Sequence, residues 1–109
     1  MSFKIIPLVR FQKDVKNLRK KFPKIKVDLE RLILELDENP ILGIALGNNL
    51  FKIRLSNSSI PSGKSSGFRV VTYYKKNDTL YLITIYSKND KDSISIESLQ
   101  EIIKEESIM

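Results

Sequence analysis

The chain has 109 residues, and its 19 lysines and arginines outnumber its 13 aspartates and glutamates, which gives a net charge of +6. A chain of this length is large enough for one modest core but too small for two, so we expect a single domain over residues 1–109. Cysteine and histidine are both absent, which excludes disulfides, thiolate and imidazole catalysis, and zinc sites built from these residues. The excess of positive charge favours an anionic partner such as nucleic acid.

No apolar run approaches the roughly 20 residues that a membrane-spanning helix needs. The N-terminus also lacks an apolar segment long enough for a secretory signal, so we expect a cytoplasmic protein without a membrane partner. The segment Gly63-Lys64-Ser65 is not a phosphate-binding P-loop, because it lacks the upstream glycine and precedes a predicted strand rather than a helix. No tight carboxylate cluster extends beyond Asp90 and Asp92. We therefore expect neither a cofactor nor a bound metal.

The first part of the chain predicts a strand followed by two helices. A short apolar run from Phe3 to Leu8 contains Pro7, which cannot donate to a strand ladder, so this strand is expected at a sheet edge. The two helices are divided by Pro23 and closed by Asn39-Pro40, since proline ends a helix and restricts the residue before it. Their apolar positions recur every three or four residues, as one face of a helix requires. These positions are Phe11, Val15, Leu18 and Phe22 in the first helix, and Ile25, Leu29, Leu32, Ile33 and Leu36 in the second.

The rest of the chain predicts three strands and a final helix. A loop over residues 41–49 leads into strands that span Leu50–Leu55, start at Phe68, and span Thr79–Ser87. Lys76-Asn77-Asp78 forms the turn between the second and third of these, which therefore pair as an antiparallel hairpin. Ser95 is a suitable N-cap for a short helix. The apolar stripe of that helix consists of Ile96, Leu99 and Ile103. This order of elements predicts an α+β domain.

Basic side chains gather on and beside the three predicted strands. In the first strand, three apolar residues alternate with Lys52 and Arg54, so the face away from the core carries only cations. The same sheet face, or the loop beside it, can gather three further cations: Lys64, Arg69 and Lys88. Cationic groups placed side by side repel each other, and a bound phosphate relieves that cost. We interpret this face as a phosphate site for RNA, and a solvated face that protects a sheet edge is the alternative.

A second basic patch covers the first predicted helix and its neighbourhood. Six of its cations are predicted to bind the backbone of an RNA: Lys13, Lys16, Arg19, Lys20, Lys21 and Lys24. Such a patch binds a polyanion backbone without reading its sequence, although a solvated helix face has the same pattern. Tyr86, beside Ser87 and Lys88, is the strand tyrosine that we place at the site, where simple packing is the alternative.

Taken in order, three segments of the chain resemble the RelE/ParE superfamily of type II toxins, and most closely its RelE-like HigB branch. The segments are Phe51–Leu55, Gly63–Val71 and Ile85–Lys88. The helical hairpin that ends in Asn39-Pro40 and the pair Leu46-Gly47 ahead of the basic strand also agree. No single motif is specific, and the resemblance depends on their order and spacing over nearly the whole chain. It implies a small twisted antiparallel sheet packed against an N-terminal helical hairpin, with a short C-terminal helix.

The resemblance also implies an activity and a set of partners. The activity is that of a metal-independent endoribonuclease, which cuts translated mRNA in the ribosomal A site and thereby inhibits translation. The partners are the ribosome with its rRNA, the mRNA, and a cognate antitoxin protein that neutralises the toxin. The basic positions of the catalytic face match Lys52, Arg54 and Arg69. Lys64 and Lys88 stand where such toxins often carry further cations.

Roles for these residues follow from the implied reaction. Arg54 and Arg69 stabilise the charge that develops on the phosphate, and Lys52 acts as the general base. Lys88 or Lys64 then protonates the leaving oxygen.

One departure from the family and two other functions stay open. Such toxins carry a catalytic tyrosine near the C-terminus, where this chain reads Asp92-Ser93-Ile94-Ser95. Either Tyr86 or a ribosomal group takes its place, or the activity is altered. A ParE-like DNA gyrase inhibitor has the same sheet but lacks catalytic cations, so the paired Lys52 and Arg54 favour the nuclease. A non-catalytic basic nucleic-acid-binding module makes the same phosphate contacts, and cleavage of translated mRNA distinguishes the two.

Overall fold

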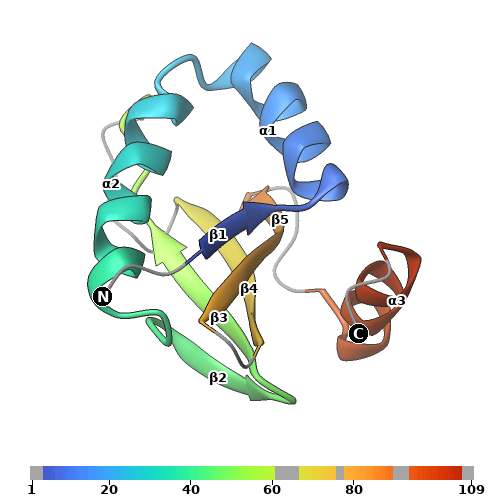
Figure 1. Cartoon of the computed structure of the whole chain (residues 1–109). Coiled ribbons are helices and arrows are strands. Elements are labelled where there is room, and N and C mark those ends of the chain that lie inside the picture. The colour runs from blue at the N-terminus through green and yellow to red at the C-terminus, as the bar shows by residue number, and fades with distance from the viewer. Residues whose placement is uncertain (1–3, 61–66, 76–77, 90–93, 107–109) are drawn as a thin grey trace.

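A computed structural model of the chain describes residues 4–60, 67–75, 78–89 and 94–106 (Figure 1). In chain order the elements are β1 (Lys4–Pro7), α1 (Val9–Lys21), α2 (Ile25–Glu38), β2 (Ile44–Gly47), β3 (Leu50–Leu55), β4 (Phe68–Lys75), β5 (Thr79–Ser87) and α3 (Ile96–Glu105). The predicted α+β class is confirmed, and the first two helices end just before Pro23 and Asn39-Pro40 as predicted. None of the described helices combines the length and the apolar character needed to cross a membrane.

The five described strands form one sheet in the order β1-β5-β4-β3-β2. β1 lies at one edge, as Pro7 predicts, but it runs parallel to β5, whereas the other neighbouring pairs are antiparallel. The pairing between β1 and β5 ends at Pro7 and Leu82, although β5 continues to Ser87. The last residues of β5 therefore extend past β1 and are not paired with it.

The strand β2 corrects the predicted loop over residues 41–49. It is four residues long and contains an alanine and a glycine, so it lacks the alternation of large apolar residues that indicates a strand. Gly43, with φ of 104°, precedes β2, and Gly47, with φ of 95°, ends it. Gly43 also lies so close to β3 that an added Cβ would stand 2.4 Å from the Lys52 carbonyl oxygen. The close pairing of β2 with β3 therefore requires glycine at position 43.

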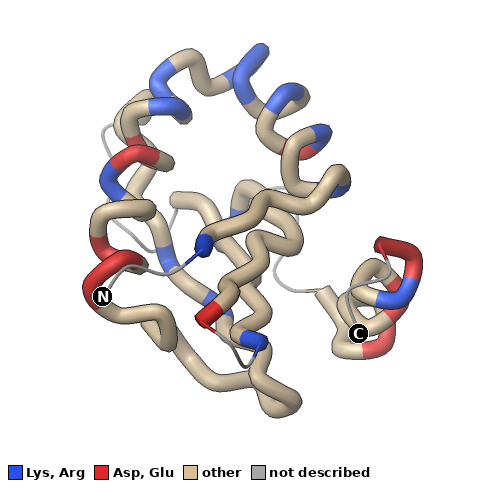
Figure 2. Tube along the Cα trace, viewed as in Figure 1, with Lys and Arg blue, Asp and Glu red and all other residues tan. Residues whose placement is uncertain are grey.

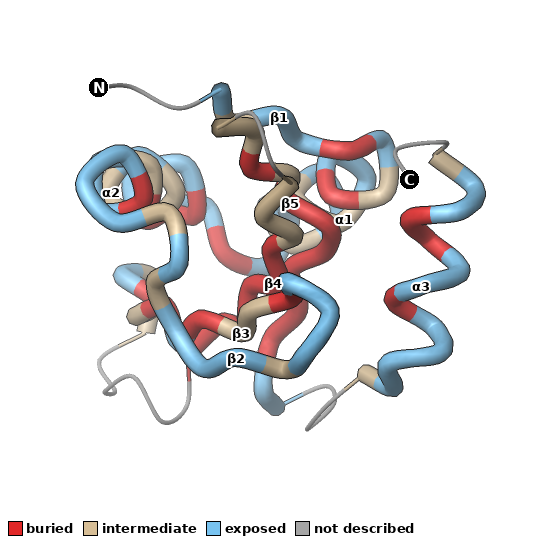
Figure 3. The backbone as a smooth tube through the Cα atoms, turned by 60° about the horizontal axis from the view of Figure 1, so that its bottom comes forward, coloured by how far each residue is buried: buried red, intermediate tan, exposed pale blue. Residues whose placement is uncertain are grey.

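Helices cover both faces of the sheet (Figures 1 and 3). α1 and α2 pack against one face, where the core includes Phe11, Phe22, Ile25, Leu32, Leu36, Ile53, Leu55, Phe68, Val70, Leu80, Leu82 and Ile85. α3 packs against the other face through buried Leu99, Ile102 and Ile103. The predicted stripe of this helix needs one correction, because Ile96 is exposed and Ile102 is buried in its place.

Contacts from the end of the chain fix the beginning of α1. This helix has no side-chain cap of its own, and the Glu106 carboxylate accepts hydrogen bonds from the backbone N–H groups of Val9 at 3.2 Å and Arg10 at 3.0 Å. A negative charge is stabilised at a helix N-terminus, so this contact attaches the end of α3 to α1. α3 itself begins at the predicted cap, Ser95, whose Oγ accepts the Ser98 N–H at 3.1 Å.

A buried carboxylate holds the beginning of the connection between β3 and β4. Asp28 of α2 has no exposed surface, and it accepts hydrogen bonds from the backbone N–H of Ser58 at 3.0 Å and from the Ser58 hydroxyl. Arg31 Nη2 donates to Asp28 at 3.2 Å and to the Ser56 carbonyl at 3.0 Å. These contacts hold the segment that follows β3 against α2. This segment begins at the same end of the sheet as Arg54.

Candidate functional site

Three of the predicted site residues form one row across the sheet. Arg54 on β3 pairs with Arg69 on β4, and Arg69 pairs in turn with Tyr86 on β5. Directly paired residues project from the same face of an antiparallel ladder, so these three side chains share one face. Lys52 lies two residues before Arg54 on β3 and shares this face as well, because side chains alternate along a strand. The sheet therefore brings together four of the five residues predicted to be catalytic.

That face is not the purely cationic surface that the sequence predicted. Leu50 shares it with Lys52 and Arg54, and it is buried in the core beneath α3. Tyr86 also belongs to this core. The alternation of residues within β3 could not predict that α3 covers Leu50, because α3 lies at the other end of the sequence. The cations consequently occupy one end of a face whose other end is apolar and covered.

Burial differs sharply within the row. Arg54 is exposed, but only 4% of Arg69 and 5% of Tyr86 is accessible, and Arg69 Nη1 donates to the Phe68 carbonyl at 3.2 Å. Burial raises the pKa of Tyr86 above its ordinary value, and the neighbouring Arg69 guanidinium opposes part of the rise. Tyr86 is therefore protonated at neutral pH. Its hydroxyl can donate a hydrogen bond or a proton there, but it cannot serve as a base.

A groove of about 370 Å³ runs along β3 beside Lys52 and Arg54. β2 pairs with β3 only as far as Lys52, so the β3 edge at Arg54 extends past its neighbour. Glu35 of α2 and Gly43 also line this groove. The carboxylate of Glu35 offsets some of the positive charge of Lys52 and Arg54 in this groove.

Lys88 follows β5 at the same end of the sheet as Arg54. Its side chain is exposed, and its backbone N–H donates to the Gly67 carbonyl at 3.1 Å. Gly67 in turn lies so close to β3 that an added Cβ would stand 2.3 Å from the Leu55 carbonyl oxygen. Lys64 and the loop around it, residues 61–66, lie outside the described residues, and so do Asp90 and Asp92. The position of Lys64 relative to the row therefore stays a prediction.

The second basic patch lies on α1 and on its connection to α2, and its six predicted cations are all exposed (Figure 2). α1 packs on the sheet face opposite to α3, so much of this patch is separated from the cations of β3. However, Asn17 of α1 lines the same small cavity as Tyr86. Lys13, Lys20 and Lys21 are three or four residues from Asn17 and are therefore its neighbours on the helix surface. Part of the patch thus extends towards the row.

A polar cluster between α1 and β5 was missed by the sequence analysis. Asp14 accepts hydrogen bonds from Arg10 Nε at 3.2 and 3.3 Å and from the hydroxyl of Thr84. These three residues line a cavity of about 160 Å³ together with Tyr86 and Ser87. The i, i+4 spacing of Arg10 and Asp14 was a visible signal for an ion pair. The contact with Thr84 was not, because 70 residues separate the two partners.

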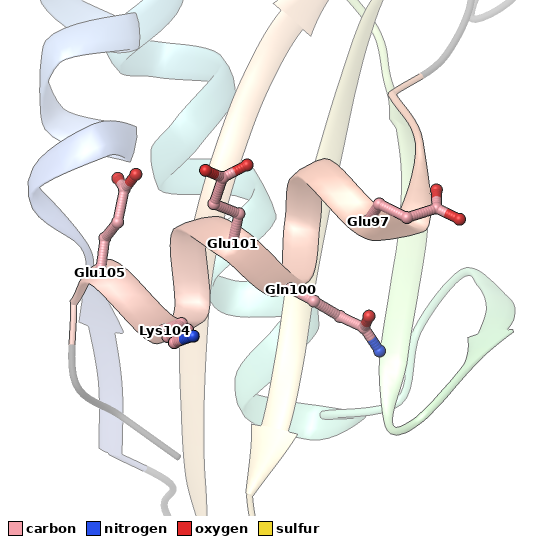
Figure 4. A pocket seen from close by; sticks show the side chains of 5 residues that line it. All are labelled: Glu97, Gln100, Glu101, Lys104 and Glu105. Carbon is pink, nitrogen blue, oxygen red and sulfur yellow. The ribbon is translucent and has the colours of Figure 1, made fainter.

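The outward face of α3 carries charge of the opposite sign. Glu97, Glu101 and Glu105 line an open hollow of about 790 Å³ together with Gln100 and Lys104 (Figure 4). Carboxylates repel a polyanion, so this hollow is unsuited to RNA although it is larger than the groove at β3.

Comparisons with known proteins identify the fold. No protein-family model matches the chain, and no curated protein matches it in sequence. Among solved structures, the free E. coli toxin RelE, as a mutant with two arginines changed to alanine, aligns over 100% of both chains with 18% identity and a TM-score of 0.60. The same mutant toxin in complex with a peptide of the antitoxin RelB aligns over 100% of this chain and 97% of that chain, with 17% identity and a TM-score of 0.57. The chain therefore has the RelE fold, as the resemblance implied, and the HigB branch stays a prediction.

Proposed function

We propose that this chain, which folds like the toxin RelE, is the toxin of a type II toxin–antitoxin system and acts as a ribosome-dependent endoribonuclease. The supporting observation is the row of Arg54, Arg69 and Tyr86, with Lys52 next to it on the same sheet face. Such a set suits the cleavage of a phosphodiester, because fixed positive charges stabilise the charge that develops on the phosphoryl oxygens. It also supplies groups that transfer protons without histidine.

In the proposed reaction, the 2′-hydroxyl of the mRNA attacks the adjacent phosphorus atom, and the bond from phosphorus to the 5′-oxygen breaks. Lys52 in its neutral form takes the proton of the 2′-hydroxyl as the general base. Arg54 and Arg69 stabilise the phosphoryl oxygens as their negative charge grows. The leaving 5′-oxygen takes up a proton, and the products are a 2′,3′-cyclic phosphate and a 5′-hydroxyl.

The proton donor for the leaving oxygen is one of three residues. Lys88 and Lys64 were the donors expected from the resemblance, and Tyr86 is the third candidate. The observation that supports Tyr86 is its direct pairing with Arg69. Burial raises the pKa of Tyr86 and so makes its hydroxyl a weaker acid, and the Arg69 guanidinium opposes part of that rise. The Arg69 guanidinium also stabilises the phenolate that forms when the proton leaves.

Expression in cells, followed by mapping of mRNA ends, tests the proposal. The wild type is expected to arrest translation and to produce cuts within translated codons. Arg54 is exposed, so Arg54→Ala preserves the core, and we expect it to slow cleavage by about 100-fold. Lys104→Ala removes a cation from the acidic face of α3 and is expected to cut like the wild type.

Buried Arg69 needs a second measurement. Arg69→Ala is expected to abolish the cuts, and its circular dichroism spectrum must match the wild type for the result to report on chemistry. If the wild type cuts mRNA while Arg54→Ala and Arg69→Ala cut it equally well, the nuclease is supported but its site lies elsewhere. Toxicity with intact mRNA and damaged DNA would instead support the gyrase inhibitor. RNA binding without any cuts would support the non-catalytic module.

The proposal also implies a cognate antitoxin. Its support is the RelE structure in complex with a peptide of the antitoxin RelB. The net charge of +6 suits a partner segment that is acidic or amphipathic. Co-expression of the antitoxin is expected to restore growth and to suppress the cuts, and growth arrest that persists with a bound antitoxin would contradict this role.

A further inference from the structure

The cavity between α1 and β5 lies where the edge strand β1 separates from its neighbour β5. β1 leaves β5 after Leu82, and α1 borders the following residues of β5 instead. The resulting cavity has a volume of about 160 Å³. Roughly five water molecules fill such a volume, so it has room for one small ring rather than for a whole nucleotide. Tyr86 lines it and also pairs with Arg69, so the cavity adjoins the proposed catalytic row.

The walls of this cavity hold polar groups in fixed positions. Thr84 and Ser87 are each only 2% exposed, and Asp14 is fixed by its hydrogen bonds to Arg10 and Thr84. A carboxylate can accept about four hydrogen bonds. Oδ1 of Asp14 accepts one of the bonds given above and Oδ2 accepts two, so Oδ1 keeps the capacity to accept another.

Asn17 supplies the complementary hydrogen-bonding group. It lies three residues after Asp14, so the two side chains are neighbours on the same face of α1, and both line the cavity. Its amide can donate two hydrogen bonds and accept two more. An acceptor and a donor that are neighbours on α1 therefore both line this small cavity, and such a pair can recognise the edge of a base.

We propose that this cavity is a nucleobase subsite that prefers cytosine to uracil. The inference rests on the proposed function, because a single-stranded RNA at the catalytic row supplies the base. Cytosine presents a donor, its C4 amino group, next to the N3 acceptor, in the order that matches Asp14 and Asn17. Uracil presents an acceptor at C4 and a donor at N3, so it fits the same pair only when its ring is displaced by one position. The amide N–H of Asn17 can then donate to the neighbouring N3 or O2 of cytosine. The exposed lysines near Asn17 would hold the RNA backbone.

Nucleosides test the subsite directly, because they carry no phosphate and do not depend on the catalytic cations. In a ¹H–¹⁵N NMR titration, cytidine is expected to shift the backbone amides of Asn17, Thr84 and Ser87. Uridine is expected to bind about ten-fold more weakly, as one well-placed polar contact to a base allows. Asp14→Asn is expected to abolish the difference between the two nucleosides, since an amide can donate to the uracil carbonyl as readily as it accepts from cytosine.

Two further variants keep the test independent of stability. Asp14→Asn loosens a contact between α1 and β5, so Asn17→Ala is measured beside it and is expected to weaken cytidine binding by about ten-fold. Gln12→Ala changes an exposed amide of the same helix that does not line the cavity, and it should bind cytidine like the wild type. The subsite is refuted if cytidine leaves the three amides unshifted, or if uridine binds equally well. Wild-type protein that prefers cytidine yet leaves translated mRNA intact would refute the nuclease and keep the subsite.

Discussion

Arg54 and Arg69 stand directly opposite each other in the β3–β4 ladder. Like charges at directly opposite positions destabilise a sheet, whereas favourable pairs at such positions contribute roughly 0.2–1 kcal/mol each. An anion that binds both guanidinium groups relieves this repulsion, so the arrangement favours the bound state over the empty one. Stability and the proposed function therefore conflict at this pair, and a change that removes one charge should move them in opposite directions.

The pair gives the first prediction. Arg54→Gln is expected to increase the free energy of unfolding by about 0.5 kcal/mol, because it removes the repulsion from buried Arg69. The gain should be larger at low ionic strength, where charges are less screened. Urea denaturation at two salt concentrations measures both effects. Lys52→Gln is the matched control, since its partner across the ladder is the uncharged Val71. A loss of stability in Arg54→Gln would show that other contacts of this arginine outweigh the repulsion.

The second prediction concerns alkaline pH and Tyr86. Burial raises the pKa of this phenol above 10.0, so at higher pH the unfolded chain loses the proton while the folded protein keeps it. The folded state then binds more protons, and the free energy of unfolding falls as the pH rises above 10.0, by at most about 1.4 kcal/mol per pH unit for one group. Tyr86→Phe should flatten this fall, which thermal melts at increasing pH measure. Some slope should persist from Tyr74, whose pKa is raised by burial and by Asp78. Equal slopes in both proteins would contradict the assignment to Tyr86.

Two glycines at the two ends of β2 provide the third prediction. Both have positive φ, but only Gly43 lies against β3, where an added Cβ would meet the Lys52 carbonyl oxygen at 2.4 Å. Gly47→Ala meets no atom within 4 Å, so it should lower the free energy of unfolding by about 1 kcal/mol through backbone strain alone. Gly43→Ala adds a clash and should cost about 2 kcal/mol or more. It should also weaken cleavage, because the clash displaces the backbone of Lys52. If the two variants lose the same free energy of unfolding, β2 moves away from β3 without a measurable loss of stability.

The contact between Glu106 and the beginning of α1 gives the fourth prediction. Glu106→Gln keeps a hydrogen-bond acceptor but removes the charge at the helix N-terminus, so it should lower the free energy of unfolding by about 0.5–1 kcal/mol. Glu105→Gln is the control, because this neighbouring carboxylate is exposed. The difference between the two variants should shrink at high salt. Chemical denaturation measures the free energy of unfolding of both variants. Equal values would show that the charge of Glu106 does not stabilise the beginning of α1.

The sequence predicted most elements well, and its errors have physical causes. Proline positions and helical spacing located α1 and α2, because these signals act within a few residues. β2 was missed because a short strand with small side chains has no alternation of its own, and its pairing comes from β3. The parallel direction of β1 could not be predicted from its residues either, since strand direction depends on the path of the chain through α1 and α2.

In the candidate site, too, some features follow from the sequence alone and others only from the tertiary structure. The sequence alone determined that Lys52 and Arg54 share one side of a strand, because alternation is a local property of the backbone. Only the tertiary structure decided that Arg69 and Tyr86 extend this pair into a row, since that depends on the register between strands. It also decided that α3 covers part of the face and that Asp14 meets Thr84. Register and packing join residues far apart in the chain, and no local pattern of residue types encodes such contacts.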